Sequence, residues 1–289
     1  MKFIEESRIG SLPGSVLTAA DVFSFKCHPG IGCFNKCCRN LNLFLYPYDV
    51  LRLRSCLGIS SDQFIETYVD VILREGNHFP DVLLTMRDDD AMSCPFLSDS
   101  GCTVYPDRPG TCRMFPMEHG RMVTSNGKTG DTIYRFRPPE FCLGPREPDL
   151  LTVKEWLVGQ DTETHNIMAD DWADIKRRFV SDPWGAEGPG GPKAKMAFMA
   201  TYNLDLFRSF VKNSSFLKRY KVSSGLVEKI LRYDISLLEF GYEWVKLFVW
   251  GEKSSYIRLR KLTGRLSKQY GGIAKASSTP SLKALISPG

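Results

Sequence analysis

A short stretch near the amino terminus holds the residues with the clearest chemistry. Residues 27–39 contain two glycines, a proline, an asparagine and four cysteines, which are Cys27, Cys33, Cys37 and Cys38. Glycine and proline favour tight turns, so side chains from one short loop can converge on one point. Converging thiolates in a reducing compartment typically hold a metal, either as a zinc site or as an iron–sulfur cluster.

A second group of cysteines follows downstream, each near a proline or a glycine: Cys94, Cys102, Cys112 and Cys142. With the first group they make eight candidate metal ligands. Four thiolates satisfy one tetrahedral zinc ion or one [4Fe–4S] cluster, so eight serve two sites, or one site with thiols to spare. The number alone does not choose between these arrangements.

The adjacent pair Cys37 and Cys38 bears on that choice. Neighbouring side chains in an extended chain point to opposite sides, so both seldom bind one ion. The pair therefore favours two neighbouring sites, or one cluster that is reached from two directions. The ninth cysteine, Cys56, falls in a predicted helix, and we interpret it as a small buried apolar residue rather than a ligand.

Other chemistries have little support in the sequence. There is no C-x2-C pair, no serine–histidine–aspartate arrangement, no phosphate loop and no dinucleotide fingerprint. His28 and His119 lie near cysteines and could each replace one as a ligand, although loop histidines are more often simply exposed. The sequence therefore gives no support for a hydrolase or for a nicotinamide-dependent enzyme.

Composition is that of a globular protein with a mild positive charge. The 289 residues are 43% hydrophobic and 25% charged, with a net charge of +5 that does not by itself argue for nucleic acid. The first residues are partly acidic where a signal peptide needs an apolar core, and no apolar run reaches membrane length. We expect a cytoplasmic protein with reduced thiols and neither membrane nor nucleic acid as a partner.

The cysteines also indicate how the chain is organised, because all nine lie between residues 27 and 142. We predict a cysteine-cluster module over residues 1–150, a helical region over 151–271 and a disordered tail over 272–289. The predicted fold class is α+β: a small metal-binding module with short strands and helices, followed by a mainly helical region.

Local patterns place elements around the cysteines. Pro47 opens a helix over 47–57, and a capping box at Ser60–Gln63 opens another over 64–70. A strand is predicted over 82–86, and a hairpin over 121–125 and 132–136 around Asn126-Gly127. Later helices are predicted from the capping box at Thr152–Glu155 to a stop at Asp182-Pro183, then over 194–212 and 225–250.

The combined motifs are more specific than any single cysteine pair. They are Cys27-x5-Cys33-x3-Cys37-Cys38-Arg39, Cys94-Pro-Phe-Leu, Gly101-Cys102-Thr-Val-Tyr-Pro-Asp-Arg108-Pro109, Cys112-Arg113-x2-Pro116 and Cys142. Over about residues 20–150 this pattern resembles the YkgJ-type cysteine-cluster family, described as a zinc- or iron-chelating domain and including the flagellin lysine methylases. The first spacing is wider than in the simplest family pattern, and the helical half matches no methylase.

The resemblance implies metal at the eight cysteines. It also implies a [4Fe–4S] cluster that takes part in methyl transfer from S-adenosylmethionine in the methylases. We interpret Arg39, Arg108 and Arg113 as cofactor-binding residues whose guanidinium groups offset the negative charge of the thiolates. The alternative for Arg108 is a cap on the turn that begins at Tyr105.

Three functions remain open at this stage. The favoured one is a metal-binding protein whose iron–sulfur cluster, or zinc, serves redox or group-transfer chemistry. The first alternative is a methyltransferase that uses S-adenosylmethionine to modify protein lysines, with the protein substrate on the helical half. The second alternative is a non-catalytic module held together by zinc, with a protein partner on the helical half.

Overall fold

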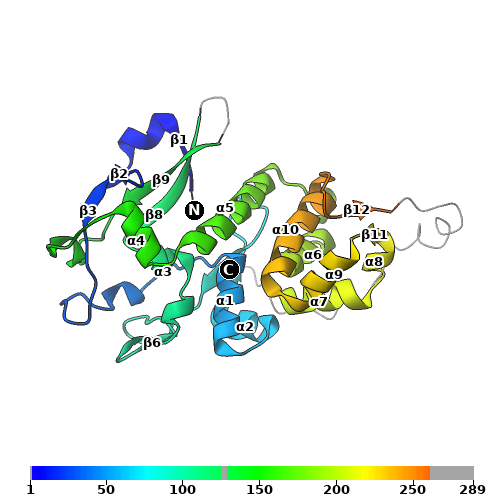
Figure 1. Ribbon diagram of the computed structural model, residues 1–289. Helices are drawn as coiled ribbons and strands as arrows, with labels where there is room; N and C mark the ends of the chain where they lie inside the picture. The colour runs from blue at the N-terminus through cyan, green and yellow to red at the C-terminus, as the bar shows by residue number, and fades with distance from the viewer. Residues whose placement is uncertain (1, 125–128, 261–289) are drawn as a thin grey trace, which may run out of the picture. The chain divides into compact units, whose positions relative to one another are not determined.

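The computed structural model describes residues 2–124 and 129–260, and the fold is α+β as predicted. The chain forms two compact units (Figure 1). The first comprises Met1–Ile59, Tyr68–Asp70 and Leu83–Arg177, and the second comprises Ser60–Thr67, Val71–Val82 and Arg178–Gly289. All nine cysteines are free thiols of the first unit. The predicted tail over 272–289 and the Asn126-Gly127 turn lie outside the described residues.

The largest sheet of the first unit has the strand order β1-β8-β9-β2. Its strands are β1 (Lys2–Glu5), β2 (Ser15–Leu17), β8 (Met117–Val123) and β9 (Thr129–Phe136). Strands β8 and β9 are antiparallel and form the predicted hairpin, whereas β1 runs parallel to β8. The hairpin strands are longer than predicted, since β8 begins four residues earlier than the expected Arg121.

Helix α1 (Pro47–Leu57) confirms the prediction at both ends. Proline suits the first helical turn, the Asp49 carboxylate accepts the Tyr46 backbone N–H at 2.8 Å, and Gly58 ends the helix with a φ of 66°. The interpretation of Cys56 as a buried residue is wrong, because its side chain is exposed. The buried face of α1 passes through Val50, Leu53 and their neighbours instead.

The remaining regular elements of the first unit are short, apart from one helix of 16 residues. They are η1 (Glu6–Ser11), β3 (Val22–Ser24), η2 (Lys36–Cys38), β6 (Leu97–Ser98), β7 (Gly101–Cys102), η3 (Tyr105–Asp107), α3 (Gly110–Met114), η4 (Gly144–Arg146), β10 (Leu150–Thr152), α4 (Val153–Gly159) and α5 (Glu163–Arg178). Strand β3 pairs with β10, and Phe23, Phe25, Met114, Met117 and Val153 form a core cluster beside them. This core holds α3 and its cysteine against the sheet.

The helix predicted from Thr152 is two helices. The capping box is confirmed, because Glu155 N–H donates to Thr152 Oγ1 at 3.1 Å and Thr152 N–H donates to Glu155 Oε2 at 2.7 Å. Helix α4 then ends at Gly159, and α5 starts at Glu163. The buried face of α5 passes through Met168, Trp172 and Ile175, which recur at helical spacing in the sequence.

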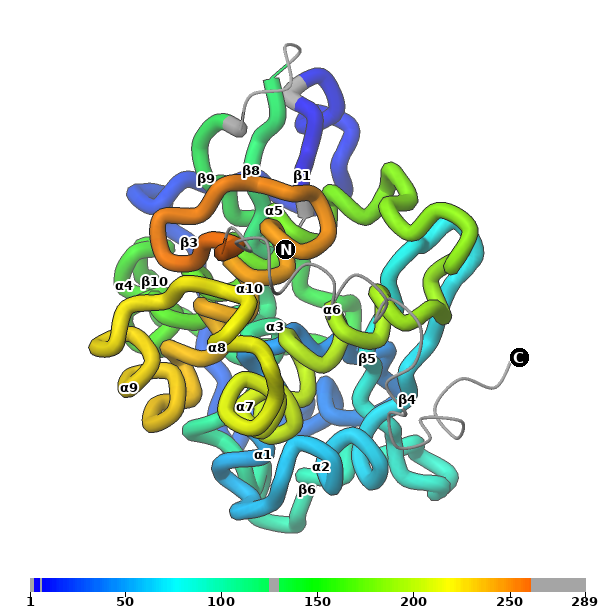
Figure 2. Tube along the Cα trace, turned by 90° about the vertical axis from the view of Figure 1, so that its right-hand side faces the viewer, coloured from blue at the N-terminus to red at the C-terminus, as the bar shows by residue number. Residues whose placement is uncertain are grey.

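The second unit is mainly helical, as Figures 1 and 2 show. Three of its elements also carry residues of the first unit: α2 (Ser61–Tyr68), β4 (Val69–Ile72) and β5 (Asp81–Leu84). The others are η5 (Phe179–Ser181), η6 (Gly185–Glu187), α6 (Pro192–Tyr202), α7 (Leu204–Asn213), α8 (Phe216–Arg219), β11 (Tyr220–Lys221), α9 (Ser224–Arg232), α10 (Asp234–Trp250) and β12 (Arg258–Leu259). Two predicted helices are each divided, one at Asn203 and the other at Tyr233. Rings of Phe207, Phe216 and Trp244 pack together in its core. No helix among the described residues is long and apolar enough to cross a membrane.

Candidate metal centre

The first cysteine loop is a series of tight turns. Backbone hydrogen bonds three residues apart follow one another along it, from Ile31 N–H to His28 O at 3.1 Å as far as Cys38 N–H to Asn35 O at 3.1 Å. Asn35 has a φ of 62°, a left-handed conformation that asparagine tolerates, and it leads into η2. The loop therefore presents several thiols within a short length of chain.

Backbone pairing brings the second group of cysteines to the end of this loop. Cys94 N–H donates to Cys38 O at 2.8 Å, and Asn40 N–H donates to Met92 O at 2.9 Å. The short β6–β7 ribbon then returns the chain, with Cys102 opposite Leu97. These bonds join segments more than fifty positions apart in the sequence, which is why spacing alone does not predict them.

Helix α3 supplies Cys112 from a fixed position. Its first residue, Gly110, donates its backbone N–H to the Asp49 carboxylate at 2.8 Å. The same carboxylate caps α1, so one buried side chain ties the start of α1 to the start of α3. Burial raises the pKa of Asp49, and the two backbone donors act in the opposite direction.

Four thiols form one neighbourhood, which we call the inner set: Cys38, Cys94, Cys102 and Cys112. Each lies within electrostatic range of the other three. Burial raises the pKa of Cys112 and then the three neighbouring thiols raise it further. Burial likewise raises the pKa of Cys94, to about 11. These buried thiols repel each other when they are ionised, and a bound cation would relieve that repulsion.

Three further thiols, those of Cys27, Cys33 and Cys142, form a second neighbourhood. We call these three and Cys37, the sequence neighbour of Cys38, the outer set. Cys142 is hydrogen-bonded to Cys33, and both lie within electrostatic range of Cys27. Cys37 and Cys38 are themselves hydrogen-bonded, which is the main reason that the pKa of Cys38 is raised. We assign Cys37 to the outer set because the inner set already has four thiols, and in the two-site interpretation the vicinal pair would then link the two sets.

Backbone N–H groups are directed at several sulfur atoms. Cys94, Cys102 and Cys142 each accept a hydrogen bond from the N–H two residues further on, a contact that lowers each thiol's pKa. Cys33 accepts one from Leu143 N–H at 3.2 Å. Such bonds favour the thiolate, the form that binds metal.

The donor set therefore fits zinc or an iron–sulfur cluster, both of which take thiolate ligands. In residues 2–124 and 129–260, no group of three or more His, Cys, Asp or Glu side chains is already arranged as a metal site. A bound metal would have to draw the sulfur atoms of each set closer together. His28 does not join either set: its Nδ1 accepts the Gly30 N–H at 3.2 Å, and its Nε2 lies 3.5 Å from Glu147.

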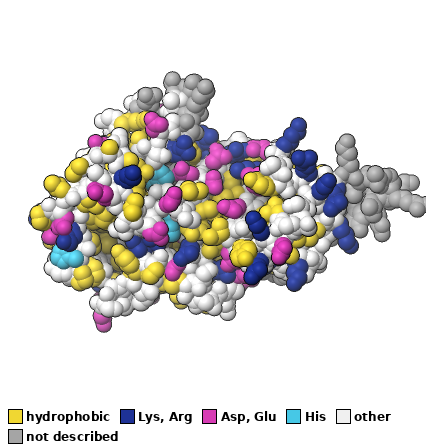
Figure 3. All heavy atoms as spheres, viewed as in Figure 1, with side chains coloured by type: hydrophobic (Ala, Val, Ile, Leu, Met, Phe, Trp, Pro, Cys, Tyr) yellow, Lys and Arg dark blue, Asp and Glu magenta, His cyan; other side chains and the backbone are white. Residues whose placement is uncertain are grey.

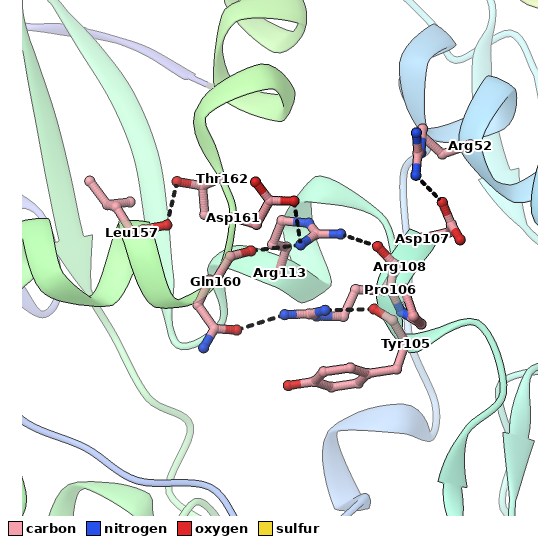
Figure 4. A network of polar contacts seen from close by, with 10 residues as sticks. All are labelled: Arg52, Tyr105, Pro106, Asp107, Arg108, Arg113, Leu157, Gln160, Asp161 and Thr162. Atoms are coloured by element: carbon pink, nitrogen blue, oxygen red, sulfur yellow. Dashed lines mark hydrogen bonds and ion pairs between the residues drawn. The ribbon is translucent and has the colours of Figure 1, made fainter.

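Two of the three arginines lie near thiols. Arg39 Nη1 donates to Ser93 Oγ at 2.9 Å, and its charge lowers the pKa of Cys38 against the larger effects that raise it. Arg108 similarly lowers the pKa of Cys102. Arg108 also caps its own turn, since it donates to Tyr105 O at 2.5 Å and lies over the Tyr105 ring (Figure 4).

Arg113 is committed to the backbone instead. Its guanidinium is buried and donates to Gln160 O at 2.6 Å and to Pro106 O at 2.5 Å (Figure 4). Those bonds join the turn before α3 to the link between α4 and α5. Arg113 therefore supports the segment that carries Cys112 by fixing backbone, and within residues 2–124 and 129–260 its guanidinium donates to no thiol.

A cavity of about 370 Å³ in the first unit adjoins the segment that carries Cys112. Its lining includes Asp49, Thr111, His119 and His165 together with aromatic and methionine side chains. No sequence motif includes His165, but it lies on the same helical face as Met168, Trp172 and Ile175 of α5, a position that predicts burial. Its Nε2 is buried without a hydrogen-bond partner among the described residues.

The two cavity histidines make the fold sensitive to acid. Burial lowers the pKa of His119 and of His165 to about 4, so both stay neutral in the folded protein well below the ordinary pKa of about 6.5. As the pH falls from about 6.5 to about 4, the unfolded chain takes up protons that the folded chain does not, and stability is lost. Each histidine accounts for up to about 3 kcal/mol of that loss.

Urea unfolding at pH 7 and pH 5 checks this prediction. His165→Gln should lose less stability between the two pH values than the parent protein does. His78→Gln, at a partly exposed position of the second unit, is the matched control and should keep the parental loss. An unchanged pH dependence in His165→Gln would refute the role of this histidine. The buried carboxyl of Asp49 and the half-buried carboxyl of Asp170 have raised pKa values and act in the opposite sense in every variant alike.

The fold and these thiols define a class of protein, a metal-binding module built on a cysteine cluster. Residues 26–143 match the model of a family described as a putative zinc- or iron-chelating domain. This match agrees with the cysteine-cluster family that the motifs resemble. All eight candidate ligands fall inside it. No curated protein and no solved structure matches the chain.

Proposed function

We propose that the module binds an iron–sulfur cluster through each of its two thiol sets and uses them in redox or group-transfer chemistry. The observation that carries the proposal is the inner set, in which every thiol lies within electrostatic range of the other three. Four thiolates are the usual ligands of a [4Fe–4S] cluster. The outer set supplies a second group of four, joined to the first through Cys37 and Cys38.

The surroundings support chemistry beyond structural stabilisation. Backbone N–H groups on the sulfur atoms and the nearby charges of Arg39 and Arg108 are the features that tune the potential of a cluster. The cavity that Gly110, Thr111 and Met114 of α3 help to line offers space for a small substrate against the helix that carries Cys112, although no cysteine is among its lining residues. A zinc ion whose purpose is to hold loops together needs no such space.

The test is the composition of protein purified without oxygen. We expect brown protein with about four iron and four sulfide for each cluster, and a visible absorption that bleaches on reduction. Colourless protein with stoichiometric zinc would overturn the iron–sulfur proposal and leave a structural zinc module. Brown protein that keeps its colour under reductant would retain the cluster and reject the redox role.

A further inference from the structure

A second cavity, of about 640 Å³, lies in the other unit and is rich in cationic and hydroxyl groups. The residues that line it are Lys221, Ser223, Gly225, Leu226, Lys229, Ser255, Tyr256 and Arg258. They come from β11, from α9 and the residue that precedes it, and from the chain between Ser255 and Arg258 at the start of β12. Figure 3 shows Lys and Arg side chains gathered over this end of the unit. We call this cavity the basic pocket.

The strand register places like charges opposite each other at the pocket. Lys221 pairs with Arg258 across the β11–β12 ribbon. The ribbon continues with Arg260 N–H donating to Arg219 O at 2.8 Å, so a second pair of cations follows two positions along. Like charges directly opposite in a sheet are destabilising, and an anion between them removes that repulsion.

Described acidic side chains do not neutralise the pocket. In residues 2–124 and 129–260, the side chains of Lys221, Lys229 and Arg258 form no ion pair. The carboxylates of Asp234 and Glu252 are paired with other arginines, and Glu243, which accepts the Ser254 hydroxyl, is paired with Lys246. From residue 253 onward the sequence contains eight basic residues and no Asp or Glu: Lys253, Arg258, Arg260, Lys261, Arg265, Lys268, Lys275 and Lys283. Glu228 is exposed on α9, but it is not among the residues that line the pocket.

The pocket also contains donors suited to oxygen atoms. Ser223 caps α9 by accepting the Leu226 N–H, so the N–H groups of Ser224 and Gly225 have no acceptor inside the helix. A Cβ at Gly225 would meet nothing within 4 Å, so a ligand can approach this backbone. The positive end of a helix and several hydroxyl groups beside cations suit a tetrahedral oxyanion.

We propose that the basic pocket binds a small molecule through a phosphate or diphosphate group. The paired cations supply the charge, the start of α9 and the hydroxyls supply directed hydrogen bonds, and the concave volume accommodates the rest of the molecule. This inference does not depend on which metal the cysteine module holds.

Calorimetric titration of the full chain with sodium pyrophosphate at constant ionic strength tests the proposal. We expect saturable binding, which Lys221→Ala and Arg258→Ala each weaken by about tenfold or more because a charged hydrogen bond is lost. Lys195→Ala is the matched control: it removes one exposed lysine of the same unit outside the pocket. Any heat from removal of metal by pyrophosphate would be the same in all three variants.

Thermal unfolding provides a second readout, because Lys221→Ala should change the unfolding temperature in opposite directions relative to the parent without ligand and with pyrophosphate. Without ligand, Lys221→Ala should unfold at a higher temperature than the parent, because the repulsion across the ribbon is relieved. It should also lose the rise in unfolding temperature that pyrophosphate gives the parent. Equal weakening in Lys195→Ala, absence of saturable binding, or a lower unfolding temperature for Lys221→Ala would each overturn the proposal. Binding to single-stranded oligonucleotides that tightens with their length would replace it with a nucleic-acid surface.

Discussion

Replacing Cys112 with serine should remove about half of the bound metal and leave the other half in place. Cys112 belongs only to the inner set, and serine keeps its size while removing the thiolate. The outer set shares no cysteine with the inner set, so its four ligands are intact in this variant. Metal analysis of protein purified without oxygen, expressed per chain, measures the loss.

The complementary variants sharpen this prediction. Cys142→Ser should remove the other half of the metal, and the double variant should remove nearly all of it. Cys56→Ala is the matched control and should keep all of the metal. The Cys56 side chain lies within electrostatic range of Cys102, but it is exposed and hydrogen-bonded to Asp107. Complete loss of metal in either single variant would show one shared site and refute the division into two sets.

The position of Cys112 depends on Asp49, which no sequence motif singles out. The carboxylate of Asp49 accepts N–H groups at the starts of both α1 and α3. A single buried group thus fixes the direction of the helix that carries Cys112 relative to α1. Buried carboxylates are retained where their hydrogen bonds are complete, and here both backbone donors are in place.

Helices with local start and stop signals could be predicted closely from the sequence. Helix α1 has proline in its first turn and a left-handed glycine after its last residue, so its limits depend on a few adjacent residues. The break between α9 and α10 has no such signal, because the apolar pattern runs through it. There the Arg208 side chain, from α7, donates to Ile230 O at 2.8 Å and pairs with Asp234. A contact between distant segments thus divides a continuous pattern.

The candidate site could be predicted only as a set of ligands. Residue types and motifs identify the eight thiols, and the adjacent pair suggests two neighbourhoods. Their membership depends on the backbone hydrogen bond from Cys94 N–H to Cys38 O and on the bond from Leu143 N–H to the Cys33 sulfur, which are properties of the folded chain. The role of Arg113 could not be predicted from the sequence either, since its partners are backbone carbonyls of other segments.

The helical unit should be most sensitive to added volume at Gly241 of α10. A Cβ built there would lie 2.2 Å from the carbonyl oxygen of Ala200 in α6 and 3.5 Å from Phe207 Cε1. The oxygen belongs to the backbone of a helix, so relief requires α6 and α10 to move apart. Overpacking of this kind costs about 1–3 kcal/mol or more, whereas alanine in place of a helical glycine gains about 1 kcal/mol. We expect Gly241→Ala to be destabilised by about 2 kcal/mol, measured by urea unfolding.

Gly225→Ala in α9 of the same unit separates the effect of space from the effect of helix propensity. A Cβ at Gly225 meets nothing within 4 Å, so this variant should keep the parental stability or gain up to about 1 kcal/mol. The two substitutions add the same methyl group to two helices, and only the contact with Ala200 differs. If Gly241→Ala proved as stable as Gly225→Ala, the close contact between Gly241 of α10 and Ala200 of α6 would be refuted.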